Sequence, residues 1–175
     1  MNGAAPGGSE RIRLLLLDVD GVLTDGSIYV GADGIETKQF HVHDGAAIVW
    51  WKKAGHEVAL LSGRSCDAVR RRAEELGIEH VIQGARIKIP PFENLLKTLS
   101  IDRSEVCYIG DDLPDLPIFR EVGVAVAPAN GRPEVRDAAA YVTTTPGGSG
   151  AVREVVEMLL RAQGQWESVL DRFRP

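Results

Sequence analysis

Short apolar runs that close on Gly, Ser or acidic residues recur along this chain, and stretches with helical spacing separate them. Runs of four to six residues of this kind are typical of strands buried in a parallel sheet. Parallel neighbours need a crossover connection, usually a helix, so the alternation predicts an α/β fold. We expect an open, mainly parallel sheet with helices on both faces. The predicted strands are 12–17, 57–61, 80–83, 105–109, 123–126 and 140–143.

The helical segments start at capping or proline positions and stop at glycines or turns. Asp44 opens the first predicted helix and Gly55 ends it. A length of 175 residues suits a single domain, which we place at 11–162. We expect a disordered leader at 1–10 and a C-terminal tail at 163–175. The other predicted helices are 65–76, 91–99, 113–120, 133–137 and 148–162.

A different pattern follows the first strand. Two β-rich runs, 27–30 and 35–40, flank the turn residues Gly31-Ala32-Asp33-Gly34, which predicts a β-hairpin over 26–40. An isolated hairpin of two strands is marginal in water. Its apolar side chains therefore need a surface to bury against.

The charge pattern narrows the classes of partner. A formal net charge of -5 offers no dominant basic field for nucleic acid or an anionic membrane. No run approaches the roughly 18 apolar residues that a membrane span requires. The N-terminus lacks the hydrophobic core of a signal peptide, so we expect a cytoplasmic protein that binds a small molecule.

Chemically active side chains follow the predicted strands at their ends. The carboxyl ends of parallel strands meet at one rim of a sheet, where ligands of such folds bind. Each residue alone is an ordinary loop, capping or surface residue, but their joint order at successive strand ends predicts a site. The residues of this predicted site are Asp18, Asp20, Ser62, Asp111 and Asp112, together with Lys88 from the loop after 80–83.

The acids predict a magnesium site. Asp18 and Asp20 are two positions apart, so in an extended backbone they project to the same side. Neighbouring carboxylates repel each other unless a cation intervenes. Together with Asp111 they make a hard oxygen site suited to Mg²⁺, beside which Asp18 would attack phosphorus and form an aspartyl-phosphate.

The remaining residues fit a phosphoryl group. Asp20 would protonate the leaving alkoxide and then activate water. Ser62 and Lys88 would hold phosphoryl oxygens, the lysine as a point charge. The backbone N–H of Gly21 adds a donor without side-chain bulk.

Four motifs contain these residues: Asp18-Val19-Asp20-Gly21-Val22-Leu23-Thr24-Asp25, Leu61-Ser62-Gly63-Arg64, Lys88, and Gly110-Asp111-Asp112 with Asp115. In them the chain resembles the haloacid dehalogenase superfamily of phosphatases. The resemblance implies a Rossmann-like fold, Mg²⁺ as cofactor, Asp18 as nucleophile and Asp20 as general acid/base. It implies metal binding by Asp18, Asp111 and the backbone carbonyl of Asp20, with Asp112 as a ligand or a support of that shell. The implied phosphate contacts are Gly21, Ser62, Gly63 and Lys88, and the weaker substrate contacts are Arg64, His43 and Asp25.

Three further stretches, 40–45, 147–155 and 160–164, resemble the subfamily of phosphatases for 3-deoxy-D-manno-octulosonate 8-phosphate (KDO 8-phosphate). The similarity covers about residues 12–165 and implies a role in lipopolysaccharide biosynthesis. Two positions depart from the subfamily, which usually has Arg where His43 and Ser149 stand. Losing two bidentate cations weakens the case for that acidic sugar. A nonulosonic acid 9-phosphate, or another sugar phosphate, is the alternative substrate.

Neither gap between the motifs has room for the cap domain that many superfamily members carry. Related phosphatases form tetramers in which a hairpin shields the neighbouring site, which implies a homotetramer built through 26–40. The hairpin could instead lie on its own domain. The C-terminal tail, with Trp166 and Phe173, is either disordered or able to reach a partner's site.

Two other functional classes remain open from the residues alone. A signalling receiver domain also combines acids, Mg²⁺ and a lysine, but it carries its phosphorylated Asp on a middle strand. Here Asp18 and Asp20 follow the first predicted strand, which favours an enzyme. A catalytically silent assembly module is the third reading, although all four motifs are filled.

Overall fold

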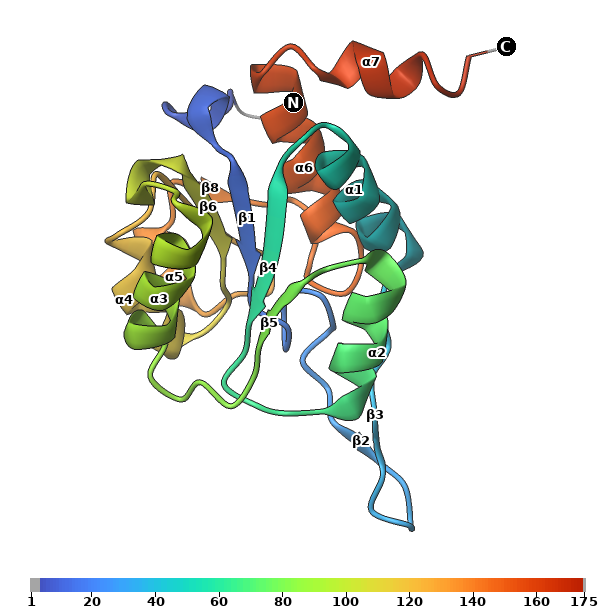
Figure 1. Cartoon of the computed structure of the whole chain (residues 1–175). Coiled ribbons are helices and arrows are strands. Elements are labelled where there is room, and N and C mark those ends of the chain that lie inside the picture. Colours follow the sequence, from blue (N-terminus) through green and yellow to red (C-terminus); the bar gives the residue numbers. More distant parts are fainter. Residues whose placement is uncertain (1–3, 175) are drawn as a thin grey trace.

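The computed structural model describes residues 4–174 and contains a six-stranded sheet whose neighbouring strands all pair in parallel. The strand order is β5-β4-β1-β6-β7-β8, which confirms the predicted α/β class (Figure 1). The strands are β1 (Leu14–Leu17), β4 (Glu57–Leu61), β5 (His80–Ile82), β6 (Val106–Ile109), β7 (Val124–Ala127) and β8 (Tyr141–Val142).

The order of the strands places a crevice at the centre of the sheet. The chain builds β1, β4 and β5 outward on one side, then returns to place β6 on the other side of β1. This is the switch point at which open α/β sheets bind ligands, beyond the carboxyl ends of the strands. The loops after β1 and β6 therefore meet where the sequence predicts the site.

Successive side chains of the central strand β1 point alternately into two hydrophobic cores. Leu15 and Leu17 belong to one buried cluster, and Leu14 and Leu16 to the other, as the two-residue period of a strand requires. The first cluster lies under α1 (Val42–Lys53), α2 (Asp67–Leu76) and α6 (Ala151–Ala162). The second lies under α3 (Ile89–Leu99), α4 (Leu116–Phe119) and α5 (Pro133–Ala138), on the other side of the sheet in Figure 1.

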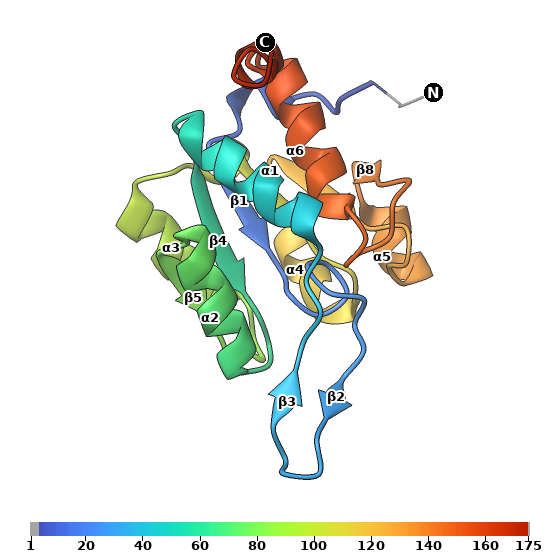
Figure 2. The same cartoon turned by 90° about the vertical axis from the view of Figure 1, so that its right-hand side faces the viewer.

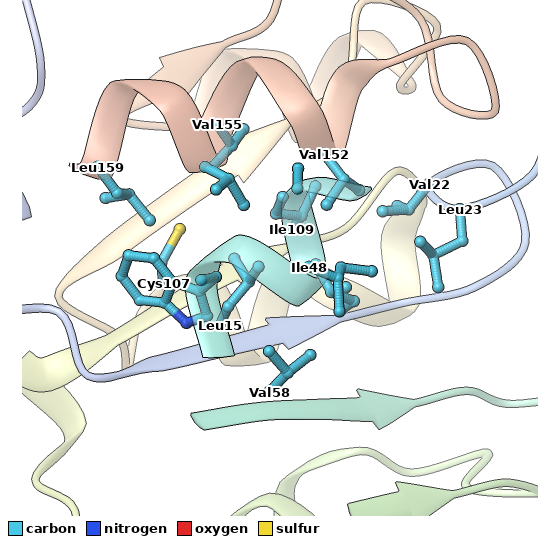
Figure 3. Close-up of a cluster of buried hydrophobic side chains, with 14 of the residues drawn as sticks. Leu15, Val22, Leu23, Ile48, Val58, Cys107, Ile109, Val152, Val155 and Leu159 are labelled. Atoms are coloured by element: carbon cyan, nitrogen blue, oxygen red, sulfur yellow. The ribbon is translucent and has the colours of Figure 1, made fainter. Parts of the chain in front are cut away.

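Helices α1 and α6 cover the first face together. Ile48 of α1 and Val155 of α6 approach Leu15 of β1 in Figure 3. Asp44 lies within the first turn of α1, because the helix starts at Val42 rather than at the predicted Asp44. Its buried carboxylate instead accepts a hydrogen bond from the backbone N–H of Arg153, at 2.7 Å, in the first turn of α6.

The hairpin forms, but its paired region is shorter than 27–30 and 35–40. Strands β2 (Tyr29–Val30) and β3 (Glu36–Thr37) pair antiparallel and project away from the domain (Figure 2). Phe40, at the hairpin's base, packs against the core of its own chain. The apolar residues nearer the tip, Ile28, Val30 and Ile35, are 52–63% exposed.

The N-terminal end contacts the domain near residue 9. Residues 1–3 of the predicted leader lie outside the described part of the chain, and Ser9–Arg11 form a 3-10 turn with Ser9 buried. The Gln163 side chain donates to the Ser9 carbonyl at 3.3 Å and to the Ile12 carbonyl at 2.8 Å. Ser9, within the predicted leader, is therefore in contact with the domain.

The predicted tail packs against its own domain. It forms α7 (Trp166–Leu170), whose apolar residues at positions i, i+3 and i+4 share one face. The Trp166 ring is 6% exposed and its centroid lies 6.0 Å from that of Trp50. Arg161 stacks over the Trp166 ring at 4.8 Å. Over residues 4–174, no helix combines the length and hydropathy needed to cross a membrane.

Candidate active site

A cavity of about 490 Å³ opens at the carboxyl ends of β1, β4 and β6. Each strand leads directly into a functional loop. The Asp18 N–H donates to the Ile109 carbonyl at 3.0 Å, and the Ser62 N–H donates to the Ile82 carbonyl at 2.9 Å, so both residues extend the sheet ladder by one step. The candidate residues that line this cavity are Asp18, Asp20, Ser62, Gly63, Arg64, Lys88, Asp111, Asp112 and Asp115.

Three carboxylates converge in this cavity. Oxygens of Asp18, Asp111 and Asp115 lie within 4.8 Å of one another. Gly21 makes the approach possible: its φ is +87°, and a Cβ there would lie 2.1 Å from Asp111 Oδ2. A side chain at position 21 would therefore displace the Asp111 carboxylate.

The cluster is electrostatically strained without a cation. Burial raises the pKa of Asp18 to about 6, against the opposing effect of Lys88. Burial, followed by repulsion from Asp18 and Asp115, raises the pKa of Asp111 to about 7. Buried, mutually repelling oxygens are the donor set that a small hard cation such as Mg²⁺ neutralises. The residues present thus fit the predicted metal.

The Asp115 carboxylate accepts four hydrogen bonds within the cluster. Its Oδ1 accepts hydrogen bonds from Lys88 Nζ and the Tyr108 hydroxyl, both at 2.6 Å. Its Oδ2 accepts from the backbone N–H groups of Asp111 and Asp112, at 2.9 and 3.1 Å. With two donors on each oxygen, Asp115 serves to fix Lys88 and the loop that carries Asp111.

Asp112 lies outside the group of three carboxylates, although it lines the same cavity. It is exposed, and its side chain accepts from the Leu113 N–H at 2.8 Å to cap the 3-10 turn Leu113–Asp115. The third carboxylate of the group belongs to Asp115. The spacing Asp112-x-x-Asp115 is that of a capping box, and this was the available sign that Asp115 turns back onto the loop.

Lys88 is a buried cation rather than a surface lysine. Its Nζ lies 3.1 Å from Asp18 Oδ1, 2.6 Å from Asp115 Oδ1 and 3.0 Å from the Tyr108 hydroxyl oxygen. Burial alone would lower the pKa of Lys88, but Asp18 and Asp115 raise it above its ordinary value. A fixed positive charge therefore faces the carboxylate of Asp18.

Sequence reasoning missed Lys38, which follows β3 on the hairpin. Its Nζ lies 2.5 Å from Asp20 Oδ1, and its side chain is 1% exposed. Arg64 approaches the other oxygen of Asp20 at 3.7 Å and pairs with Glu36 at 2.8 Å. A lone lysine in a polar arm carries no sequence signal that separates it from a solvated one.

Three predicted contacts are absent from the lining of this cavity. The Gly21 N–H donates to Thr24 Oγ1 at 3.3 Å. Asp25 is exposed and accepts from the Ser27 N–H at 2.8 Å. His43 lines a different cavity of about 650 Å³, which also contains Ser149 and none of the three clustered acids.

The chain is similar to known phosphatases over most of its length. The model of the haloacid dehalogenase-like hydrolase family matches residues 88–155. The 3-deoxy-D-manno-octulosonate 8-phosphate phosphatase of Escherichia coli K12 is 48% identical over 157 residues, which is 90% of this chain and 84% of the relative. The corresponding phosphatase of Yersinia pestis is 45% identical over the same share of both chains.

Solved structures agree with the sequence relatives. The Moraxella catarrhalis 3-deoxy-D-manno-octulosonate 8-phosphate phosphatase, in complex with magnesium, phosphate and KDO, superposes with a TM-score of 0.93 at 44% identity, over 95% of this chain and 96% of that one. The cobalt-bound Haemophilus influenzae phosphatase superposes with a TM-score of 0.90 at 41% identity, over 94% and 95% of the two chains.

Proposed function

The chain belongs to the haloacid dehalogenase-like hydrolases, within the family of KDO 8-phosphate phosphatases, and from this premise we propose that it hydrolyses KDO 8-phosphate to KDO and phosphate with Mg²⁺. One observation carries the chemistry. The Asp18 carboxylate lies at the end of the central strand, in a cavity that also holds Lys88 and Asp111.

Asp18 is the proposed nucleophile. One of its oxygens attacks phosphorus while the bond from phosphorus to the sugar oxygen breaks, which gives an aspartyl-phosphate. Attack requires the ionised carboxylate, and Lys88 at 3.1 Å from Oδ1 favours that form. Lys88, Ser62 and Gly63 line the same cavity and would hold the phosphoryl oxygens.

Asp20 is the proposed general acid and base. It gives a proton to the departing sugar alkoxide, then takes one from the water that attacks phosphorus and releases phosphate. A bound Mg²⁺, held by Asp18, Asp111 and the backbone carbonyl of Asp20, would offset the repulsion between the attacking carboxylate and the phosphoryl oxygens. Asp115 holds the loop of Asp111 in place, because its carboxylate accepts hydrogen bonds from the backbone N–H groups of Asp111 and Asp112.

We also propose that the active form is a cytoplasmic homotetramer assembled through the hairpin, acting in lipopolysaccharide biosynthesis. The exposed Ile28, Val30 and Ile35 leave an apolar surface on the hairpin. Ile87 and Leu113 are 75% and 52% exposed, and each adjoins a residue of the cavity lining. Docking one surface on the other would exclude water from a site over which residues 4–174 fold no cap domain.

Phosphate release from a small panel tests the function. The purified protein is offered KDO 8-phosphate, a nonulosonic acid 9-phosphate and glucose 6-phosphate, each with Mg²⁺ and with a chelator. We expect the highest kcat/KM for KDO 8-phosphate, loss of turnover in chelator, and loss in Asp18→Asn but not in the surface control Asp137→Asn. A higher kcat/KM for the nine-carbon acid would reassign the substrate, and full turnover in chelator or in Asp18→Asn would refute the chemistry.

A further inference from the structure

A buried lysine from the hairpin reaches the acid that the proposed reaction uses for proton transfer. Lys38 Nζ is hydrogen-bonded to Asp20 Oδ1 at 2.5 Å, although 18 positions separate the two residues in the chain. The bond joins the arm after β3 to the loop after β1. It is therefore a tertiary contact between the hairpin and the active site.

Four charged side chains close a ring around this contact. Glu36 Oε1 lies 2.8 Å from Lys38 Nζ and Glu36 Oε2 lies 2.8 Å from the Arg64 guanidinium. Arg64 in turn approaches Asp20 Oδ2 at 3.7 Å, so each oxygen of Asp20 faces one cation. Glu36 and Lys38 share a side of the extended arm because they are two residues apart.

Within the ring, Lys38 is the member that holds Asp20. Lys38 Nζ lies 2.8 Å from Glu36 Oε1, and its shorter contact is the hydrogen bond to Asp20 Oδ1 at 2.5 Å. Arg64 is 47% exposed and more distant, so solvent screens it. Burial alone would lower the pKa of Lys38, but Asp20 and Glu36 raise it, which keeps Nζ charged.

Direct contact with substrate is not open to this amine. The Lys38 side chain is 1% exposed, and Lys38 is absent from the residues that line the cavity, whereas Asp20 lines it. An acid that must meet a leaving oxygen within hydrogen-bond reach needs a fixed rotamer. Lys38 lies outside the cavity lining and is placed to hold the rotamer of Asp20 through this hydrogen bond.

We propose that Lys38 is a positioning residue that orients the Asp20 carboxyl group toward the leaving oxygen of the substrate, an inference that rests on the proposed function. This contact also links the position of the hairpin to the reaction, because displacing β3 would move Lys38 away from Asp20. The role is in proton delivery and leaves binding of the sugar to other residues.

The dependence of kcat/KM on the basicity of the leaving group tests this proposal. Phenyl phosphate and 4-nitrophenyl phosphate are nearly the same size, but phenolate needs a proton to depart and 4-nitrophenolate hardly does. Their kcat/KM values, measured with Mg²⁺, report the steps up to departure of the leaving group. The ratio of the two is independent of how much of a variant is correctly folded.

Lys38→Met keeps the length and apolar stem of the side chain and removes its charge. We expect kcat/KM for phenyl phosphate to fall about 10–100-fold further than that for 4-nitrophenyl phosphate, a part of the 10²–10⁴ that general acid catalysis supplies. Asp20→Asn should show the full effect, Lys38→Arg should recover much of the ratio, and the exposed control Lys97→Met should leave it unchanged.

An equal loss for both aryl phosphates in Lys38→Met, beside a selective loss in Asp20→Asn, would overturn the proposal and leave the proposed function intact. A raised KM for KDO 8-phosphate with an unchanged ratio would overturn it in favour of substrate binding. If Asp20→Asn itself leaves the ratio unchanged, the assignment of Asp20 as the acid fails, and the role of Lys38 fails with it. A wild-type enzyme that is inactive on KDO 8-phosphate but shows the expected ratios would refute the substrate alone.

Discussion

Replacing Asp18 by Asn should stabilise the metal-free protein while removing its activity. The Asp18 carboxylate is 8% exposed and belongs to a cluster of three acids. Burial raises its pKa from 3.8 to about 6. A difference of that size corresponds to about 3 kcal/mol by which the charged form disfavours folding at neutral pH.

The pKa of about 6 already includes the attraction of Lys88, whose Nζ lies 3.1 Å from Asp18 Oδ1. A gain of about 3 kcal/mol raises the Tm of a domain of this size by about 6–12 °C. The sign follows from proton linkage. The folded carboxyl group keeps its proton up to about pH 6 and the unfolded one loses it near 3.8, so wild-type stability falls as pH rises between these values.

Thermal unfolding in chelator, followed by circular dichroism, measures the difference. At about pH 7.5 Asp18→Asn should melt above the wild type, and at about pH 4.5 the gap should shrink. Excess Mg²⁺ should raise the Tm of the wild type more than that of the variant. Asp137→Asn, an exposed acid on α5, is the matched control and should melt with the wild type. A variant no more stable than the wild type in chelator at the higher pH would refute the account of the acid cluster.

Three other predictions concern the rest of the molecule. Asp44→Ala should lower the free energy of unfolding in urea by about 1–2 kcal/mol, because it removes the acceptor of the Arg153 N–H. Asp44→Asn retains that acceptor and should lose less. Equal stability of the wild type and both variants would contradict this. Val30→Glu should reduce the mass measured by light scattering, since it charges the 63% exposed hairpin face, and an unchanged mass would exclude that face as the interface. In native protein a thiol reagent should modify the partly exposed Cys66 and spare Cys107, whose pKa is raised by complete burial; modification of both at equal rates would contradict the packing.

The strand ends were predictable because two independent sequence signals coincide there. An apolar run marks where each strand is buried, and the first polar residue after it marks where the strand leaves the core. Asp18, Ser62 and Asp111 sit at such boundaries, and the sheet brings them to one cavity. Lys88 lies farther from its strand, in the loop after β5, and it is predicted at the same rim because that loop follows a strand end; it lines the cavity as well.

The remaining features depend on contacts that no local pattern records. Lys38 acquires its partner only when the hairpin folds back on the loop after β1. His43 lines another cavity, to which α6 contributes Arg153 and Glu157. Tertiary packing, rather than propensity, decides each of these.

The central claim is that Asp18 attacks phosphorus beside a cation shared with Asp111. A crystal structure of the wild-type protein with Mg²⁺ and orthovanadate tests it most directly. The account predicts vanadium bonded to an Asp18 carboxylate oxygen, the metal ligated by Asp18 and Asp111, and Asp20 facing the apical oxygen on the opposite side. Vanadate bound in the cavity with water in place of Asp18 at the apical position, or a metal held away from Asp111, would contradict it.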